Sequence, residues 1–302
     1  MKALQVAQFG PPEVLRVVDV AEPHAGPGQI RVAVRAAGVN PVDWKIRSGA
    51  MQQFMPVQLP YVPGSDVAGV VDEVGHGVSG VAVGEEVFGF AVGGGAAEYA
   101  VLEHFAAKPA EMGWAEAAGL PVAVETAVRA LDLLGVSAGQ TLLINGAAGG
   151  VGTAAVQFAR ARDAVVIGTA SPANHDYLRS LGATPTTYGA GLVDRVRELA
   201  PSGVDHAFDA AGAGALPELV ELTGSPERVL TIADPQAQQY GVPYTGGGGQ
   251  RSYQALGEAA RLFAQGRFSM AVTRTFPLAD APQAHLISEQ GHVRGKLTLL
   301  LD

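Results

Sequence analysis

Hydrophobic and polar residues alternate in short runs over the first third of the chain, from residue 1 to about residue 110. A period of two places successive side chains on opposite faces of a strand, and Pro and Gly turns separate the runs. The clearest runs cover residues 15–20, 29–39, 66–75 and 85–90. This part of the sequence therefore predicts a compact β-barrel domain.

The pattern changes near residue 113 to a helical spacing of apolar residues and then alternates between strand and helix up to about residue 268. Strands that alternate with helices form a parallel sheet, because each helix carries the chain back to the start of the next strand. We therefore predict an α/β fold with a doubly wound parallel sheet. The expected strands cover residues 141–146, 164–170, 183–189, 204–212, 227–234 and 240–246.

The last segment, residues 270–302, has the pattern of a strand, an amphipathic helix and a closing strand. We expect this segment to return to the first domain and to complete it. The predicted domains are therefore residues 1–115 together with 269–302 for the barrel, and residues 116–268 for the parallel sheet.

The amino-acid composition limits the number of domains, the cellular location and the kinds of partner that we expect. The 302 residues, of which 48% are hydrophobic, suffice for two domains with cores of their own. No apolar run reaches the roughly 18 residues of a membrane span, and residues 1–10 contain no signal-peptide core, so we expect a cytoplasmic protein without a membrane partner. A chain without cysteine has no disulfide and no thiolate metal site. The net charge of −9 argues against nucleic acid as a partner.

The most informative stretch is residues 141–163, where a buried strand passes through a glycine-rich turn into a helix. The free N–H groups at the start of that helix face the turn, and small residues let a pyrophosphate approach them closely. An ordinary tight turn is the alternative, but the strand that follows at residues 164–170 favours a dinucleotide site. In the G-x-G-x-x-G frame the positions are Ala147, Gly149 and Gly152. The candidate cofactor-binding residues of the turn are Asn145, Gly146, Ala147, Ala148, Gly149, Gly150, Val151 and Gly152.

The end of the next strand indicates which dinucleotide binds. NAD-selective sites place an acid there to bind the ribose hydroxyls. This strand instead ends Gly168-Thr169-Ala170-Ser171, and no acid follows before Asp176. Small hydroxyl residues leave room for a 2′-phosphate and donate hydrogen bonds to it. We therefore predict NADPH as the cofactor, with Thr169 and Ser171 as candidate ligands.

Several strings, in the same order along the chain, resemble the medium-chain dehydrogenase/reductase superfamily, and within it the zinc-free quinone oxidoreductase and enone (alkenal) reductase group. They are RAAGVNPVDWKIRSG (35–49), PYVPGSDVAGVVDEVG (60–75), GAAGGVG (146–152), FDAAG (208–212) and GKL (295–297). The resemblance covers nearly the whole chain. It implies a GroES-like catalytic barrel, a Rossmann domain that binds NADPH, and a homodimer in which residues 240–246 form the pairing edge of the sheet.

The resemblance also implies that the metal site of zinc-dependent relatives is missing. The positions of the cysteine, histidine and glutamate of those relatives are Asn40, Ser65 and Asp66 here. An amide, a hydroxyl and one carboxylate are poor zinc ligands. Without a Lewis acid, reduction of an activated C=C bond is more feasible than alcohol oxidation, because the developing enolate needs only hydrogen-bond donors.

Residues 40–45 resemble the NPVDxK stretch of alkenal and enone reductases. The resemblance makes Lys45 the first candidate for stabilising the enolate or relaying a proton. It also makes Asn40 a candidate for contacting substrate or nicotinamide. The alternative for Lys45 is a solvated surface lysine, and the alternative for Trp44, which would wall the substrate pocket, is simple packing. Asp43 is expected to cap or bridge the turn.

Further cofactor residues are expected at the carboxyl ends of the parallel strands, where ligands bind in such sheets, and in the helix before the glycine turn. The expected nicotinamide-lining residues are Thr126, Ala210, Ala211, Ile232 and Ala233. The resemblance implies that the Tyr188 side chain contacts the 2′-phosphate of the cofactor. It also implies that the Lys296 side chain reaches the cofactor. Asp209 is expected to be structural, because a charge beside hydride transfer needs a compensating partner.

Together these features predict a zinc-independent, NADPH-dependent reductase. Its reaction would transfer hydride to the β-carbon of an α,β-unsaturated carbonyl, or to a quinone, as a small-molecule substrate. Two alternatives stay open: a biosynthetic enoyl reductase that acts on a polyketide-like or carrier-bound intermediate, and a redox-inactive NADPH-binding protein. In an enoyl reductase, substrate size would be set by pocket residues that otherwise only pack, namely Met51, Phe54, Tyr240 and Tyr244.

Overall fold

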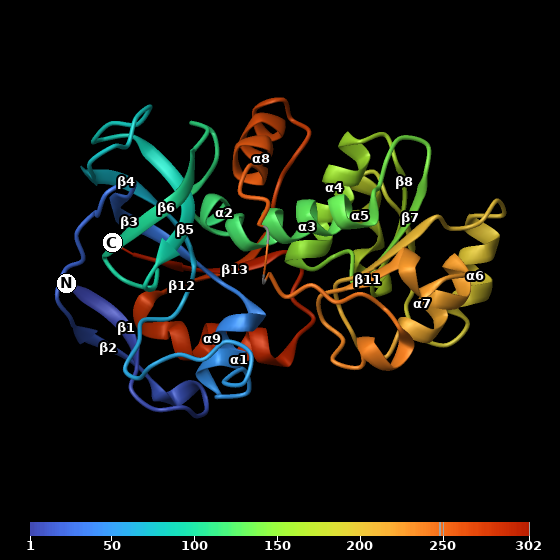
Figure 1. The fold of residues 1–302 in the computed structure, drawn as a ribbon, viewed down its shortest axis with the longest axis horizontal. Coiled ribbons are helices and arrows are strands. Elements are labelled where there is room, and N and C mark those ends of the chain that lie inside the picture. Colours follow the sequence, from blue (N-terminus) through green and yellow to red (C-terminus); the bar gives the residue numbers. More distant parts are fainter. Residues whose placement is uncertain (248, 250, 302) are drawn as a thin grey trace. The chain divides into compact units, whose positions relative to one another are not determined.

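The computed structural model describes residues 1–247, 249 and 251–301. The chain forms two compact units, of which the first comprises Met1–Val122 and Leu256–Asp302, and the second comprises Ala123–Ala255 (Figure 1). The chain therefore leaves the first unit inside helix α3 (Pro121–Leu134) and re-enters it at the start of helix α8 (Ala255–Ala264). The division into domains at residues 115 and 268 stays a prediction.

A six-stranded sheet organises the first unit, in the order β12-β13-β3-β4-β5-β6, and an additional pairing of β3 with β6 closes the four strands from β3 to β6 on themselves. The strands β12 and β13 pair in parallel, and the other neighbours pair antiparallel. The predicted β-barrel is thus confirmed. Its strands are β3 (Ile30–Val39), β4 (Asp66–Val74), β5 (Glu86–Val92), β6 (Tyr99–Ala107), β12 (Val272–Pro277) and β13 (Lys296–Leu300), and a separate antiparallel pair consists of β1 (Lys2–Val6) and β2 (Leu15–Asp19).

The alternating pattern of β3 separates the inside of this barrel from its outside. Ile30, Val32 and Val34 are buried in the barrel core, whereas Arg35 is exposed. Burial of an apolar side chain of this size contributes about 1.5–3 kcal/mol. The period of two read from the sequence therefore corresponds to the hydrophobic core of the first unit.

Two helices of the first unit pack against each other (Figure 1). Helix α1 (Pro41–Arg47) follows β3 after a single residue, and helix α9 (Ala281–Gln290) lies between β12 and β13 in the sequence. A short helix, α2 (Trp114–Ala118), packs against β3, β4 and β13. The C-terminal segment thus returns to the first unit, where it supplies β12, α9 and β13.

A five-stranded parallel sheet organises the second unit, in the order β11-β10-β7-β8-β9. The chain proceeds from β7 through β8 to β9 and then continues on the other side of β7, so the strand order reverses beside β7. Such a reversal opens a crevice at the carboxyl ends of the strands, which is where ligands bind in these sheets. The predicted doubly wound parallel sheet is confirmed. The strands are β7 (Thr141–Asn145), β8 (Val165–Thr169), β9 (Thr184–Thr186), β10 (His206–Asp209) and β11 (Val229–Thr231).

Helices cover both faces of this sheet. Leu143 of β7 shares a core cluster with Val196 of α6 and Leu219 of α7. Its neighbours Leu142 and Ile144 point to the opposite face, where α4 packs against β7 and β8. Besides most of α3, the helices of the second unit are α4 (Gly150–Ala161), α5 (His175–Ser180), α6 (Leu192–Leu199) and α7 (Leu216–Thr223).

No helix in the described part of the chain combines the length and the apolar character that crossing a lipid bilayer requires.

The helical pattern of residues 114–135 is interrupted in the structure. It forms two helices, because α2 ends at Ala118, with Gly119 as its C-cap, and α3 begins at Pro121. Proline fits the first turn of a helix, where its missing N–H is not needed, but it disrupts a helix interior. The predicted helical pattern is therefore present as two helices.

The expected strand at residues 240–246 is reduced to a single β-bridge. Tyr244 pairs with Thr231 in parallel, and the preceding residues form the 3-10 turn Ala237–Tyr240. Pro243 has no N–H to donate, and Gly241 has a φ of 67°. Pairing therefore cannot extend toward residue 240.

Candidate active site

The glycine turn of the second unit connects β7 to α4. Gly149 is the N-cap of α4, and its carbonyl accepts the Thr153 N–H at 2.8 Å. A Cβ on Gly152 would lie 2.2 Å from the Gly146 oxygen, so packing alone requires that glycine. A Cβ on Gly149 would meet only the Gly146 oxygen, at 3.5 Å. The protein itself thus tolerates a side chain at Gly149, and the open space beside the free N–H groups of α4 suits an anion.

A buried polar network joins four strands at their carboxyl ends, directly below this turn. Thr169 of β8 donates to the Asn145 Oδ1 at 2.7 Å, and Asn145 of β7 donates to the Asp209 Oδ1 at 2.9 Å. Thr231 of β11 donates to the other oxygen of Asp209 at 2.7 Å. The Gly146 N–H donates to the Thr169 hydroxyl at 3.1 Å, so the network also fixes the first residue of the turn.

Asp209 is fully buried, and it accepts the Gly212 N–H at 2.8 Å as well as the bonds from Asn145 and Thr231. These donors occupy both of its oxygens, which gives it the structural role that a buried carboxylate of this kind takes. The loop after β10 is held in place by this carboxylate.

The predicted cofactor residues occupy different environments in the second unit. Thr169 is fully buried, with its hydroxyl used inside the network, whereas Ser171 is half-buried and Tyr188 is 51% exposed. Ser171 accepts a hydrogen bond from Asn174 at 3.2 Å. Ala147 and Ala148 are buried, Ala211 is exposed, and Val151, Ala210, Ile232 and Ala233 are half-buried. Of the two hydroxyls at the end of β8, that of Thr169 is therefore enclosed and that of Ser171 is more accessible.

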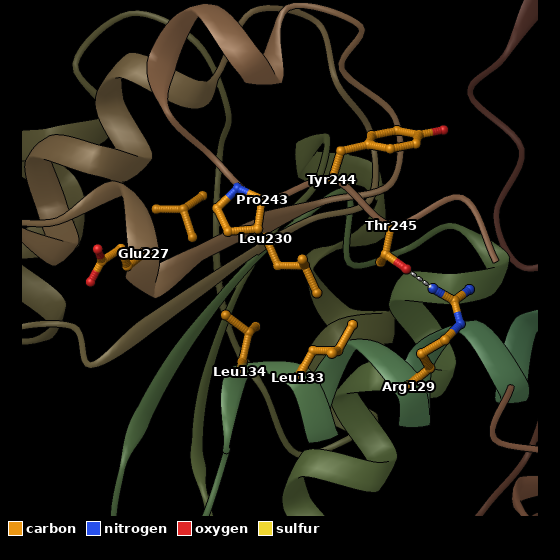
Figure 2. Close-up of a pocket in the computed structure, with 9 residues that line it drawn as sticks. Arg129, Leu133, Leu134, Glu227, Leu230, Pro243, Tyr244 and Thr245 are labelled. Atoms are coloured by element: carbon orange, nitrogen blue, oxygen red, sulfur yellow. Dashed lines mark hydrogen bonds between the residues drawn. The ribbon is translucent and has the colours of Figure 1, made fainter. Parts of the chain in front are cut away.

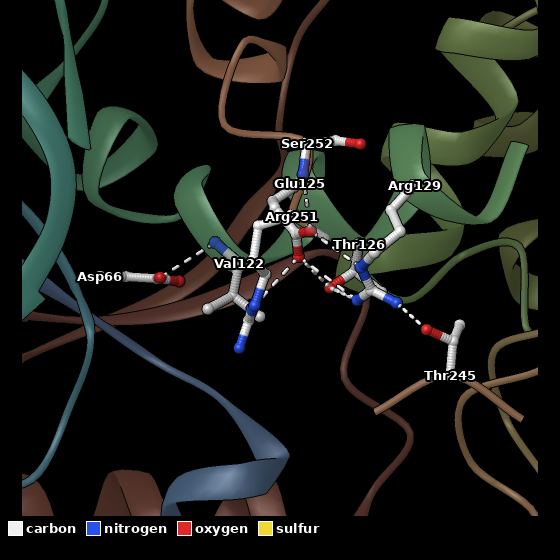
Figure 3. A network of polar contacts seen from close by, with 8 residues as sticks. All are labelled: Asp66, Val122, Glu125, Thr126, Arg129, Thr245, Arg251 and Ser252. Carbon is white, nitrogen blue, oxygen red and sulfur yellow. Dashed lines mark hydrogen bonds and ion pairs between the residues drawn. The ribbon is translucent and has the colours of Figure 1, made fainter. Parts of the chain in front are cut away.

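A buried carboxylate near the start of α3 lies between two arginines (Figure 3). Glu125 is fully buried and pairs with Arg129 at 2.8 Å and with Arg251 at 3.3 Å. It also accepts the Ser252 N–H at 3.1 Å, while Arg129 reaches the hydroxyls of Thr245 and Thr126. These bonds fasten the segment after the Tyr244 bridge to α3 and hold Thr126, which is 7% exposed.

In the first unit, Asn40 lies at the junction of β3 and α1. As the N-cap of α1 its backbone N–H donates to the Asp43 carboxylate at 2.7 Å, which is half of a capping box. Asp43 therefore has the capping role expected from the sequence. The Asn40 side chain also joins a second buried group.

That group consists of Asn40, Asp66 at the start of β4, and Lys296 at the start of β13. The Asn40 Nδ2 donates to the Asp66 Oδ2 at 2.9 Å, and the Lys296 Nζ donates to the Asn40 Oδ1 and lies 3.3 Å from the Asp66 Oδ2. The other oxygen of Asp66 accepts the Val122 N–H at 3.0 Å (Figure 3). All three side chains are at least 95% buried. The ammonium of Lys296 is committed to these partners.

Burial dominates the electrostatics around α1. It raises the pKa of Asp43 to about 7, with the Asp66 charge adding to the effect and the Asn40 N–H and Lys296 opposing it. Burial also lowers the pKa of His285 to about 4, helped by the Arg47 charge. Arg47 is itself fully buried and pairs with Glu289 at 3.2 Å. Helix α1 therefore carries ionisable groups on its buried side.

The other predicted residues of the first unit are more open. Lys45 and Trp44 are half-buried, and the Lys45 ammonium lies 5.7 Å from the centroid of the Trp44 ring. Met51 is half-buried, whereas Phe54 is 77% exposed. In the second unit, Tyr240 and Tyr244 are 38% and 54% exposed. Phe54, Tyr240 and Tyr244 are therefore exposed side chains.

The residues at the zinc positions of related dehydrogenases do not fit that metal. Asn40 and Asp66 offer oxygen to a lysine ammonium, and Ser65 offers only a hydroxyl, whereas zinc prefers His nitrogen or Cys sulfur. Across residues 1–247, 249 and 251–301, no three His, Cys, Asp or Glu side chains gather as metal ligands would.

Comparison with known proteins identifies the family. Two family models match, one described as alcohol dehydrogenase GroES-like domain at residues 26–112 and one as zinc-binding dehydrogenase at residues 181–299. The quinone oxidoreductase of Rattus norvegicus is 33% identical over 325 residues, which cover 100% of this chain and 98% of the rat protein. The chain belongs to the quinone oxidoreductase family. This confirms the resemblance seen in the sequence strings.

Solved structures of the same superfamily, the medium-chain dehydrogenases/reductases, agree with this assignment. The quinone oxidoreductase of Coxiella burnetii has 31% identity and a TM-score of 0.81, and the match covers 100% of this chain and 99% of that one. A mycobacterial protein solved in complex with NADPH has 30% identity and a TM-score of 0.84, with 100% of both chains covered. The quinone oxidoreductase family member described here is therefore an oxidoreductase of a superfamily that binds nicotinamide cofactors.

Sequence reasoning did not find the Glu125 network in this quinone oxidoreductase family member. A signal was present, because Glu125 and Arg129 stand four residues apart in an otherwise apolar stretch of helix. Charged residues at that spacing contact each other, and charges on an apolar face are buried only when paired. The pairing with Arg251 had no such local signal, since it joins residues 126 positions apart.

Proposed function

We propose that this protein is an NADPH-dependent reductase of α,β-unsaturated carbonyl compounds or quinones, working without zinc as a homodimer in the cytoplasm. The observation that carries the proposal is the open space at Gly149, where the fold accepts a Cβ and yet the chain has none. A dinucleotide pyrophosphate beside the N-terminus of α4 accounts for that space.

The proposed NADPH-binding residues are those of the glycine turn and the strand ends of the second unit. The N–H groups at the start of α4 would hold the pyrophosphate, and Ser171 and Tyr188 would face the 2′-phosphate, since neither is enclosed by the fold. The absence of an acid between residues 169 and 175 supports NADPH over NADH. When bound, NADPH supplies the hydride for the reduction.

The proposed substrate residues are in the first unit. Lys45 is half-buried and makes no ion pair within the described residues, so its ammonium remains available to a substrate oxygen. Asn40 is held rigidly and is the second proposed donor. A donor to the carbonyl oxygen stabilises the enolate that forms when hydride reaches the β-carbon, and water or Lys45 then supplies the proton.

Lys45→Ala tests this assignment. The variant should lower kcat/KM on an enone by about 10-fold or more, because a hydrogen-bond donor to the developing negative charge is lost. Its dissociation constant for NADPH, measured by fluorescence titration, should not change. Lys2→Ala is the matched control, because Lys2 is a solvent-exposed lysine of the same unit that pairs with Asp19.

The same assay separates the proposed reductase from the alternative of a redox-inactive NADPH-binding protein. Steady NADPH oxidation by the wild-type protein with a panel of enones and quinones supports a reductase. Tight NADPH binding with no turnover across the panel would instead indicate a redox-inactive binding protein. Unchanged kcat/KM in Lys45→Ala would remove that lysine from the mechanism.

A further inference from the structure

The side-chain amide of Asn40 is held at both ends by opposite charges. Its oxygen accepts a hydrogen bond from the Lys296 ammonium, and its nitrogen donates to the Asp66 carboxylate at 2.9 Å. The reverse orientation would set the amide hydrogens against an ammonium and the amide oxygen against a carboxylate. The two charges therefore fix which way the amide faces.

One donor of this amide is left over. A side-chain amide carries two N–H groups, and Asn40 uses one of them for Asp66. Within the described residues no acceptor takes the second. Since Asn40 is only 3% exposed, water competes little for this N–H, and an acceptor placed against it would form a hydrogen bond in a low-dielectric setting.

The ammonium also changes the strength of that donor. Lys296 is 4% exposed, and its ammonium donates a hydrogen bond to the Asn40 amide oxygen. This positive charge draws electron density from the amide nitrogen toward the oxygen. Hydrogen bonds in a chain polarise one another, and more so inside a protein than in water. Asp66 balances the charge of Lys296, so the pair is buried without a net charge.

We propose that Lys296 is a positioning residue that orients and polarises Asn40, so that the free N–H of Asn40 binds the carbonyl oxygen of the substrate. This inference rests on the proposed reductase function. In that reaction the acceptor gains a hydride from NADPH at its β-carbon, its C=C electrons move onto the carbonyl oxygen as an enolate, and a proton from water then adds to the α-carbon. NADPH is oxidised. The ammonium acts through the amide, at the step where negative charge reaches the oxygen.

The role differs from the one that the sequence resemblance implied. There, Lys296 was expected to reach the cofactor, which would make NADPH affinity depend on it. Its two partners in the first unit instead predict an effect on turnover. Measuring kcat and the NADPH dissociation constant of one Lys296 variant distinguishes a role in turnover from a role in cofactor binding.

Lys296→Met keeps the length of the side chain and removes its charge. We expect this variant to lower kcat on an enone by roughly 10-fold, with an unchanged dissociation constant for NADPH. Asn40→Ala should lower kcat by about 100-fold, because it removes the donor itself. In the Asn40→Ala background, Lys296→Met should have no further effect on kcat. A weakened NADPH affinity with normal kcat, or additive effects in the double variant, would overturn the proposal.

Lys108→Met is the matched control for removing a buried ammonium. Lys108 is also buried in the first unit and pairs with a carboxylate, Glu86, at 2.8 Å. The control should lose stability in thermal unfolding and keep its kcat. If Lys296→Met does not fold, Asn40→Ala still decides, because it leaves the ion pair between Lys296 and Asp66 intact. A normal kcat in Asn40→Ala would contradict the inference.

A second readout does not depend on turnover. The side-chain amide protons of Asn40 should resonate farther downfield in the wild-type protein than in Lys296→Met, because the ammonium polarises the amide. An unchanged resonance would overturn the inference even in an active enzyme. Conversely, a wild-type protein that reduces no enone or quinone would refute the proposed function, while the shifted resonance would still show a polarised amide.

Discussion

Asp43 shows how a single buried side chain comes to depend on pH. Its carboxylate caps α1 through the Asn40 N–H, yet burial raises its pKa from the ordinary value of 3.8 to about 7. The folded state therefore binds a proton on Asp43 at pH values where the unfolded chain has released it. Asp43 contributes its full stability below about pH 4, and that contribution is lost as the pH rises through 7.

Asp43→Asn should remove this dependence, because an amide oxygen can still accept the Asn40 N–H. Relative to the wild type, the free energy of unfolding of the variant should rise by about 4 kcal/mol between pH 4 and pH 7. Urea denaturation across that range measures it. The variant must be compared with the wild type at each pH, because His285 changes the stability of both proteins in the opposite direction. Burial lowers the pKa of His285 to about 4, so its contribution to the free energy of unfolding increases as the pH rises. A difference that stays constant with pH would contradict the prediction.

The sequence identified the members of the polar cluster but not their contacts. Asn40 and Lys296 were both candidates, for separate reasons, and they lie 256 positions apart. Nothing in a period of two or 3.6 residues relates positions at that distance. Their contact arises because β13 pairs with β3, which brings the start of one strand to the end of the other. Local patterns predict the residues of a site, whereas sheet topology decides which of them meet.

At the scale of elements, the connection from β7 to α4 combines two kinds of glycine. Gly152 is required by close packing, since any Cβ there would overlap the Gly146 oxygen. Gly149 has room for a Cβ and ordinary helix N-cap dihedral angles, with a φ of −73°. Only a glycine of the second kind indicates a ligand, because no contact within the protein explains why position 149 has no side chain.

Gly149→Val should therefore fold and fail to bind the cofactor. The added methyl groups would stand beside the N-terminus of α4, and we expect the dissociation constant for NADPH to rise roughly 100-fold, which corresponds to about 3 kcal/mol. Thermal unfolding should show a loss of about 1 kcal/mol or less. Gly113→Val is the control, because Gly113 is also a helix N-cap with open space around it. Normal NADPH titration of Gly149→Val would contradict the placement of the pyrophosphate.

The elements themselves were largely predictable. Alternation identified the barrel strands β3, β4 and β5, and the strand and helix pairs of the second unit followed from the change of period. Prolines set details that the hydrophobic pattern did not predict. Pro121 divides a helical pattern into two helices, and Pro243 limits an apparent strand to one bridge. In both places the hydrophobic pattern continues through the proline, but proline has no backbone N–H to donate to a helix or a strand pair.

At the scale of the whole molecule, the second sheet has an edge beyond β11. The Tyr244 bridge lies on this edge, next to a cavity of about 360 Å³ between the end of α3 and residues 243–245 (Figure 2). Leu133 and Tyr244, which line the cavity, are 62% and 54% exposed. Exposed apolar side chains beside an unpaired edge are typical of a surface that a second copy of the chain covers.

Tyr244→Lys should weaken the proposed homodimer. A charge placed in the apolar part of the interface should cost roughly 2 kcal/mol of association free energy. Sedimentation velocity over a series of protein concentrations would show the variant dissociating where the wild type is dimeric. Val83→Lys, at a position that is 65% exposed in the first unit, is the control and should sediment as the wild type does. Identical sedimentation of Tyr244→Lys and wild type would remove this edge from the interface.

The position of β13 between β12 and β3 has a consequence for biosynthesis. Every other described strand precedes β13 in the chain, so a ribosome delivers the strand that joins β12 to β3 after all the described strands of the second unit. The parallel sheet is then free to fold during translation, while residues 36–39 of β3 still lack one of their strand partners and can pair with a wrong strand. Lys296 therefore meets Asn40 only after the described strands of the second unit have been synthesised.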